Sequence, residues 1–87
     1  MTAGSFAGPL FANLGADVVK IERPDGNGGM RQWPPLTGET DSVPGFNENF
    51  APVNRGKRSE ALNLKRADDV AQFKQLAAVA DIFIENY

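Results

Sequence analysis

Apolar residues at the start of the chain recur at helical spacing. The pattern runs through residues 3–14, and Gly15 follows as a residue suited to a helix end. Proline is tolerated near the first turn of a helix or at a kink, so with Pro9 in this segment the helix could begin later than residue 3. The spacing therefore predicts a short amino-terminal helix.

Two later segments have the spacing of extended chain. Residues 17–22 are rich in β-branched residues and end at Arg23-Pro24, where proline disfavours continued regular structure. Residues 60–65 alternate, with Leu62 and Leu64 on one face and polar residues on the other. Both segments are predicted to be β-strands.

The stretch at about 25–54, between these strands, has no hydrophobic period. It is rich in Gly and Pro and contains Trp33, Phe46 and Phe50, so we expect a long irregular loop that could include one short turn of helix. Loops of this length are usually functional or disordered, and the aromatic residues favour a loop that packs over a ligand or a partner subunit.

The last part of the chain predicts a helix and then a strand. Asp68 and Asp69 open the helix, where negative charge is favoured. The apolar stripe of this helix consists of Val70, Phe73, Leu76, Ala77 and Ala80. Residues 81–87 contain a consecutive apolar run, typical of a strand covered on both faces. Strand, helix and strand form a βαβ crossover, so we predict an α/β fold with a parallel sheet and more protein around it.

Composition narrows the classes of function. With 87 residues the chain is one small domain at most, and a formal net charge of −2 argues against a nucleic-acid partner. The absence of Cys and His removes disulfides, thiolate nucleophiles, Cys/His metal sites and imidazole bases. No segment has the length of a membrane span or the pattern of a signal peptide, so we expect a cytoplasmic protein without a membrane partner.

Each candidate ligand-binding segment also has an interpretation that requires no ligand. Gly26–Gly29 follows a strand but matches no phosphate-binding motif, which favours a flexible turn. A basic cluster could meet an anion or form a solvated turn; its members are Arg55, Lys57, Arg58, Lys65 and Arg66. Arg23 and Asn86-Tyr87 fall at the carboxyl ends of predicted strands, where ligands bind in α/β sheets, yet capping or anchoring roles are equally open. No serine has a nucleophile elbow or a histidine partner, so no catalytic centre is visible.

Several segments, in order, resemble family III CoA-transferases, the group that includes formyl-CoA:oxalate and carnitine CoA-transferases. The segments are 3–17, 18–24, 54–59, 61–65 and 80–87. Each is weak alone, but the ordered set is specific and spans nearly the whole chain. The resemblance implies a partial Rossmann-like parallel sheet with a βαβ crossover, incomplete at both ends, in the amino-terminal part of a coenzyme A-binding domain.

In that family a catalytic aspartate moves CoA between an acyl-CoA and a carboxylic acid, through an anhydride and then a thioester, without metal. That aspartate falls beyond the equivalent of Tyr87, so the resemblance assigns no catalytic residue to this chain and implies that the isolated piece is inactive. It does assign part of the coenzyme A site. The implied contacts are Arg23 at the nucleotide end, Leu62, Asn63, Leu64 and Lys65, then Asn86 with Tyr87, and Thr2 with Ala3. An interlocked homodimer is the implied assembly.

Three alternatives remain open. An α-methylacyl-CoA racemase would share the fold, although Glu85-Asn86-Tyr87 resembles the transferases more. The chain could also be a coenzyme A-binding module without activity, or a dimer-contact segment that uses the aromatic loop. Met30–Trp33 carries an Arg and a Trp similar to those of the family, whereas residues 25–29 differ in length, which leaves the acyl substrate undetermined.

Overall fold

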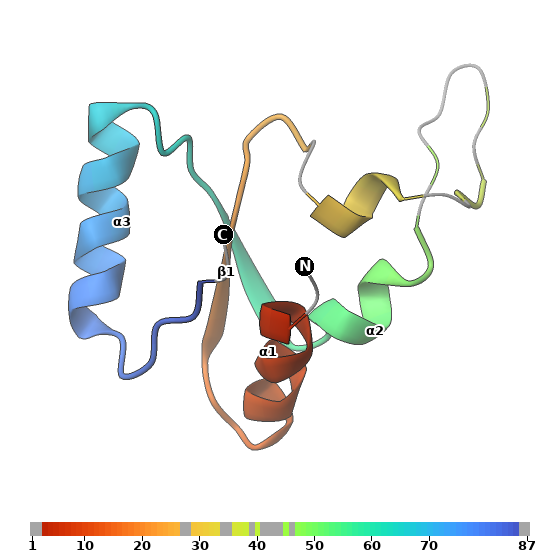
Figure 1. Ribbon diagram of the computed structural model, residues 1–87, viewed down its shortest axis with the longest axis horizontal. Helices are drawn as coiled ribbons and strands as arrows, with labels where there is room; N and C mark the ends of the chain where they lie inside the picture. Colours follow the sequence, from red (N-terminus) through yellow and green to blue (C-terminus); the bar gives the residue numbers. More distant parts are fainter. Residues whose placement is uncertain are drawn as a thin grey trace.

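The computed structural model describes residues 3–26, 29–33, 36–38, 40, 45 and 47–85. Helices and strands follow in the order α1 (Ala3–Asn13), β1 (Val18–Glu22), the 3₁₀ helix η1 (Gly29–Gln32), α2 (Phe50–Asn54), β2 (Lys57–Ala61) and α3 (Ala67–Val79). Figure 1 shows α1 and α2 on one side of the two strands and α3 on the other. This arrangement confirms the predicted α/β fold.

The described sheet consists of β1 and β2, which run parallel. Val18 pairs with Lys57 at one end and Glu22 with Ala61 at the other, and the Leu62 amide still donates to the Glu22 carbonyl at 2.9 Å. Parallel neighbours need a crossover connection, and here the segment carrying η1 and α2 provides it. Because the strands are parallel, their carboxyl ends lie together at one edge.

Few side chains of the described residues are buried. Phe50 and Val53 of α2 are buried, as expected for residues three apart on one face of a helix, and Leu62 is buried just after β2. The Asn47 side chain is also buried, and its Oδ1 accepts a hydrogen bond from the Asn49 amide at 2.9 Å. Because α1 packs against α2 and against both strands, it joins the connection between the strands to the sheet.

The first half of the chain contains the predicted amino-terminal helix and more helix after it than expected. The helix predicted over residues 3–14 is confirmed as α1, which starts at Ala3 and has Pro9 inside it. Proline removes one amide donor only, and the ladder continues beyond it, with the Leu14 amide donating to the Leu10 carbonyl at 3.3 Å. The segment at about 25–54 contains two short helices, η1 and α2, and the sequence suggested room for one such turn.

The second strand lies earlier than predicted, at 57–61 instead of 60–65, so Lys57 and Arg58 of the basic cluster lie in the strand. The Asn63 side chain explains the end of the ladder, because its Oδ1 accepts the Lys65 amide at 3.0 Å and offers the backbone a turn instead. Leu62 and Leu64 therefore do not share one buried face: Leu62 is 3% exposed and Leu64 is 43% exposed.

The predicted third strand is absent from the described residues at 81–85. Ile82, Phe83 and Ile84 are exposed, although the Phe83 ring meets Phe73 of α3 edge to face at 5.8 Å between centroids. An apolar strand needs a paired neighbour and cover on both faces, and the described part of the chain offers this run neither. None of the described helices is both long and apolar enough to span a membrane.

Candidate functional site

A pocket of about 540 Å³ opens beyond the carboxyl ends of β1 and β2. The lining residues are Ile21, Glu22, Arg23, Pro24 and Asp25 from the first strand, and Leu62, Asn63, Leu64 and Lys65 from the second. Its volume falls in the range of small-molecule sites, and its place at the strand ends is where open α/β sheets bind ligands. The structure therefore brings together Arg23 and the predicted stretch Leu62–Lys65.

Arg23 lies at the mouth of this pocket. Its guanidinium pairs with the Asp25 carboxylate at 2.5 Å, and its side chain is 67% exposed. The Gly26 amide donates to the Arg23 carbonyl at 3.2 Å, which closes the turn that holds both side chains. Exposed ion pairs contribute little stability, so a ligand phosphate could replace the Asp25 carboxylate at low cost.

The opposite wall is a turn fixed by side chains. Asn63 accepts the Lys65 amide on its Oδ1 at 3.0 Å and the Arg66 amide on its carbonyl at 2.9 Å. The Asn63 amide in turn donates to Asp69 Oδ2 in the first turn of α3, at 2.9 Å. Sequence reasoning gave Asp69 a role in the helix dipole only. Its contact with the Asn63 amide joins the turn to α3, and no pattern in the sequence indicates this contact.

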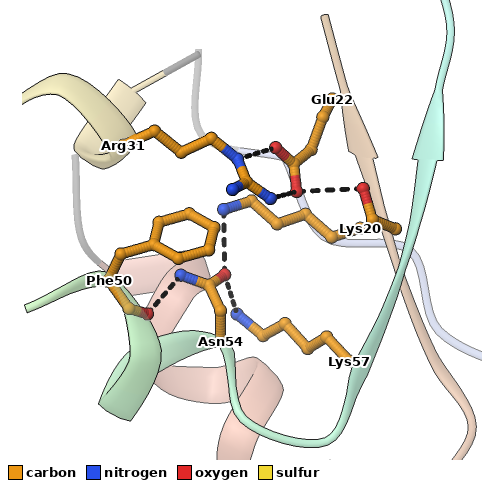
Figure 2. Close-up of polar contacts among 7 residues, drawn as sticks. Lys20, Glu22, Arg31, Phe50, Asn54 and Lys57 are labelled. Carbon is orange, nitrogen blue, oxygen red and sulfur yellow. Dashed lines mark hydrogen bonds and ion pairs between the residues drawn. The ribbon is translucent and has the colours of Figure 1, made fainter. Parts of the chain in front are cut away.

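Glu22 lines the pocket, and its carboxylate also belongs to a polar cluster that is shown in Figure 2. Arg31 of η1 donates twice to this carboxylate, from Nε to Oε2 at 2.6 Å and from Nη2 to Oε1 at 3.0 Å. The Ser59 hydroxyl also donates to Oε1, at 3.0 Å. These hydrogen bonds, above all those from Arg31, hold the pKa of Glu22 below its ordinary value.

Two lysines meet at Asn54 in the same cluster. Asn54 Oδ1 accepts Lys20 Nζ at 2.8 Å and Lys57 Nζ at 3.3 Å, while its Nδ2 donates to the Phe50 carbonyl at 2.8 Å. Lys57 also donates to the Val53 carbonyl at 2.8 Å. Burial lowers the pKa of both lysines.

The Phe50 ring completes the cluster. Lys20 Nζ lies 4.5 Å from the ring centroid, and the guanidinium carbon of Arg31 lies 4.0 Å from it. Both distances are those of cation–π contacts. Sequence reasoning missed this cluster, although the alternation of β1 places Lys20 and Glu22 on one face.

The predicted basic cluster does not gather at one site. Arg58 pairs with Asp17 at 2.7 Å in an exposed ion pair, Lys57 turns toward α2, and Lys65 lies at the pocket. Arg55 and Arg66 are exposed. This dispersal favours the solvated interpretation for Arg58 and leaves Lys65 as the member that lines the pocket.

The remaining predicted contacts cannot be placed. Thr2, Asn86 and Tyr87 lie outside the described residues, and Ala3 is the first residue of α1. Within the described ranges, no group of three or more acidic side chains could hold a metal ion. Of the predicted contact residues, Arg23 and Leu62–Lys65 are thus the ones that line the pocket.

At the level of families, residues 1–87 match CoA-transferase family III. Curated relatives include the mouse succinyl-CoA:glutarate CoA-transferase, 42% identical over 98% of this chain and 18% of the relative. The succinate–glutarate CoA-transferase of Agrobacterium fabrum is 38% identical over 98% of this chain and 22% of the relative. The succinyl-CoA:mesaconate CoA-transferase of Haloarcula marismortui is 42% identical over 98% of this chain and 21% of the relative. No solved structure matches. The chain spans about a fifth of the length of these relatives.

Proposed function

Because the chain belongs to CoA-transferase family III, we propose that it supplies part of the coenzyme A site of an enzyme that moves CoA between an acyl-CoA and a carboxylic acid. The observation that supports this proposal is the pocket at the carboxyl ends of two parallel strands, which is lined by both Arg23 and Leu62–Lys65. The relatives described above are all named as CoA-transferases, which favours transfer over racemisation.

The chemistry of the lining suits the coenzyme. Arg23 offers a planar guanidinium to a phosphate or an adenine ring, and Lys65 adds a second positive charge. Leu62 and Leu64 supply apolar surface between these cations, and the turn at Asn63 keeps backbone groups at the pocket wall. The anionic and apolar parts of an acyl-CoA would each meet a matching surface here.

The substrate class follows from the relatives. Their names pair succinyl-CoA with glutarate or mesaconate, so we propose dicarboxylic acids as the acids between which CoA moves. On the resemblance alone we also propose contacts from Thr2, Ala3, Asn86 and Tyr87, an interlocked homodimer and a cytoplasmic location. None of the acidic residues described above is proposed as the catalytic aspartate of the family.

Isothermal titration of CoA into the 87-residue chain tests the binding site, with Arg23→Ala and Arg58→Ala compared and circular dichroism as the check of folding. Arg58 is the matched control because it is also an ion-paired arginine with a 67% exposed side chain, but does not line the pocket. Loss of one charge-assisted contact at Arg23 should weaken binding about tenfold or more, whereas Arg58→Ala should not change it. Folded wild-type chain that binds no CoA, or equal losses in the two variants, would contradict the proposal.

A further inference from the structure

The pocket wall contains two carboxylates beside its two cations, and each carboxylate would repel a phosphate-bearing ligand unless its charge is compensated. Arg23 and Lys65 are positive, and Glu22 and Asp25 are negative, so the lining is formally neutral. A ligand with several phosphate charges requires an excess of positive charge close to it. At least one of the two carboxylates must therefore be compensated from outside the lining.

Asp25 is compensated on the ligand side, by Arg23 itself, and both side chains are exposed to water that screens them. Glu22 is different because its side chain is only 10% exposed. Its charge is poorly screened and acts on a ligand in the pocket at close range. Glu22 is consequently the carboxylate whose compensation matters most for anion binding.

Arg31 is placed to provide this compensation. From η1 it donates to both Glu22 oxygens, and it is not among the residues that line the pocket. We propose that Arg31 is a positioning residue that sets the affinity of the pocket for phosphate-bearing ligands by neutralising the Glu22 carboxylate. The inference rests on the proposed coenzyme A site and adds a residue to it.

The main alternative is that Arg31 only anchors the connection between the strands. Besides Glu22 it contacts the Phe50 ring, so it joins η1 to both β1 and α2. In that case, adding Glu22→Gln to Arg31→Gln would not restore the CoA affinity that is lost in Arg31→Gln. If Arg31 acts by neutralising Glu22, the double variant removes one positive and one negative charge together. The net charge at the pocket wall then stays the same, and the CoA affinity is kept. The double variant therefore separates the two roles.

The experiment is a double-variant cycle read by isothermal titration of CoA at low ionic strength, with thermal unfolding recorded for each protein. Arg31→Gln should bind CoA about threefold to tenfold more weakly than wild type, and the difference should shrink in high salt. Arg31→Gln combined with Glu22→Gln should return to within about twofold of wild type. Arg58→Gln, which breaks a pair outside the pocket, should bind as wild type does.

Two further variants keep the test decisive if Arg31→Gln is poorly folded. Arg31→Lys retains the charge and should keep nearly wild-type affinity, and Glu22→Gln alone should bind CoA at least as tightly as wild type. The inference is wrong if Arg31→Gln binds like wild type, if the double variant stays as weak as Arg31→Gln, or if Glu22→Gln weakens binding. In each of these cases the proposed coenzyme A site would still be supported, provided that the wild-type chain binds CoA and Arg23→Ala weakens this binding. A folded wild-type chain that binds no CoA would refute both.

Discussion

Replacement of Gly8 by alanine measures how firmly Lys57 is held beneath α1. Gly8 is buried, and a methyl group there would overlap the Lys57 Cε atom and lie 2.8 Å from its Nζ. The end of a lysine side chain is normally free to move aside. Here its ammonium group donates to the Val53 carbonyl at 2.8 Å and to Asn54 Oδ1 at 3.3 Å. Lys57 can therefore make room for the methyl group only by giving up these contacts.

Two opposing effects decide the sign. Gly→Ala in a helix stabilises by about 1 kcal/mol through backbone entropy alone. Displacing Lys57 loses hydrogen bonds from a charged donor, each worth about 1.5–3 kcal/mol, of which water recovers a part because Lys57 is only partly buried. We expect the net loss to equal one such bond or slightly more, which exceeds the gain in backbone entropy. Gly8→Ala should therefore destabilise the fold by about 1–2 kcal/mol.

Urea unfolding followed by circular dichroism gives the free energy of unfolding for Gly8→Ala in the wild-type and Lys57→Ala backgrounds. In the Lys57→Ala background the overlap is absent, so the same change should stabilise by about 1 kcal/mol. The reversal of sign is the specific signature of the Lys57 contact. If Gly8→Ala stabilises the wild-type chain, Lys57 is not held as described.

Two more predictions concern the pocket residues. Leu62→Ala should lower the free energy of unfolding by about 2–4 kcal/mol in urea, because Leu62 is 3% exposed; a loss below about 1 kcal/mol would contradict this burial. The lowered pKa of Glu22 means that its contribution to stability is present above the ordinary glutamate value of 4.5 and is lost as the pH falls through the folded-state value. Glu22→Gln should therefore flatten the fall of the melting temperature in acid, and identical pH profiles for the two proteins would count against the Arg31 pair.

Elements with strong local signals were predictable from the sequence. The helical spacing before Gly15, the β-branched run before Arg23-Pro24 and the acidic start of the last helix correspond to α1, β1 and α3. These patterns arise from interactions within a few residues, so the sequence carries them directly. The strand-end argument also directed attention to Arg23, which does line the pocket.

Features that depend on distant contacts were not predictable in the same way. The hydrogen bond from Lys20 to Asn54 joins residues 34 positions apart, and no period in the sequence reveals it. The apolar run at 81–85 has the composition of a buried strand, but composition does not supply the neighbour that such a strand must pair with. The end of β2 was misplaced because the Asn63 side chain competes locally with the ladder, which outweighs the alternation of Leu62 and Leu64.

The polar cluster around Glu22 also explains why the two walls of the pocket meet. In the observed register Lys20 lies opposite Ser59, so the Ser59 hydroxyl reaches Glu22 on the same face of the sheet. A slip of one residue in β2 would turn Ser59 to the other face and remove that contact, together with the alignment of Glu22 and Ala61. The contacts that compensate the Glu22 charge thus also favour the register in which Arg23 and Leu62 leave the sheet side by side. If the proposed coenzyme A site is correct, its affinity for the coenzyme and the pairing of the strands are therefore linked through one carboxylate.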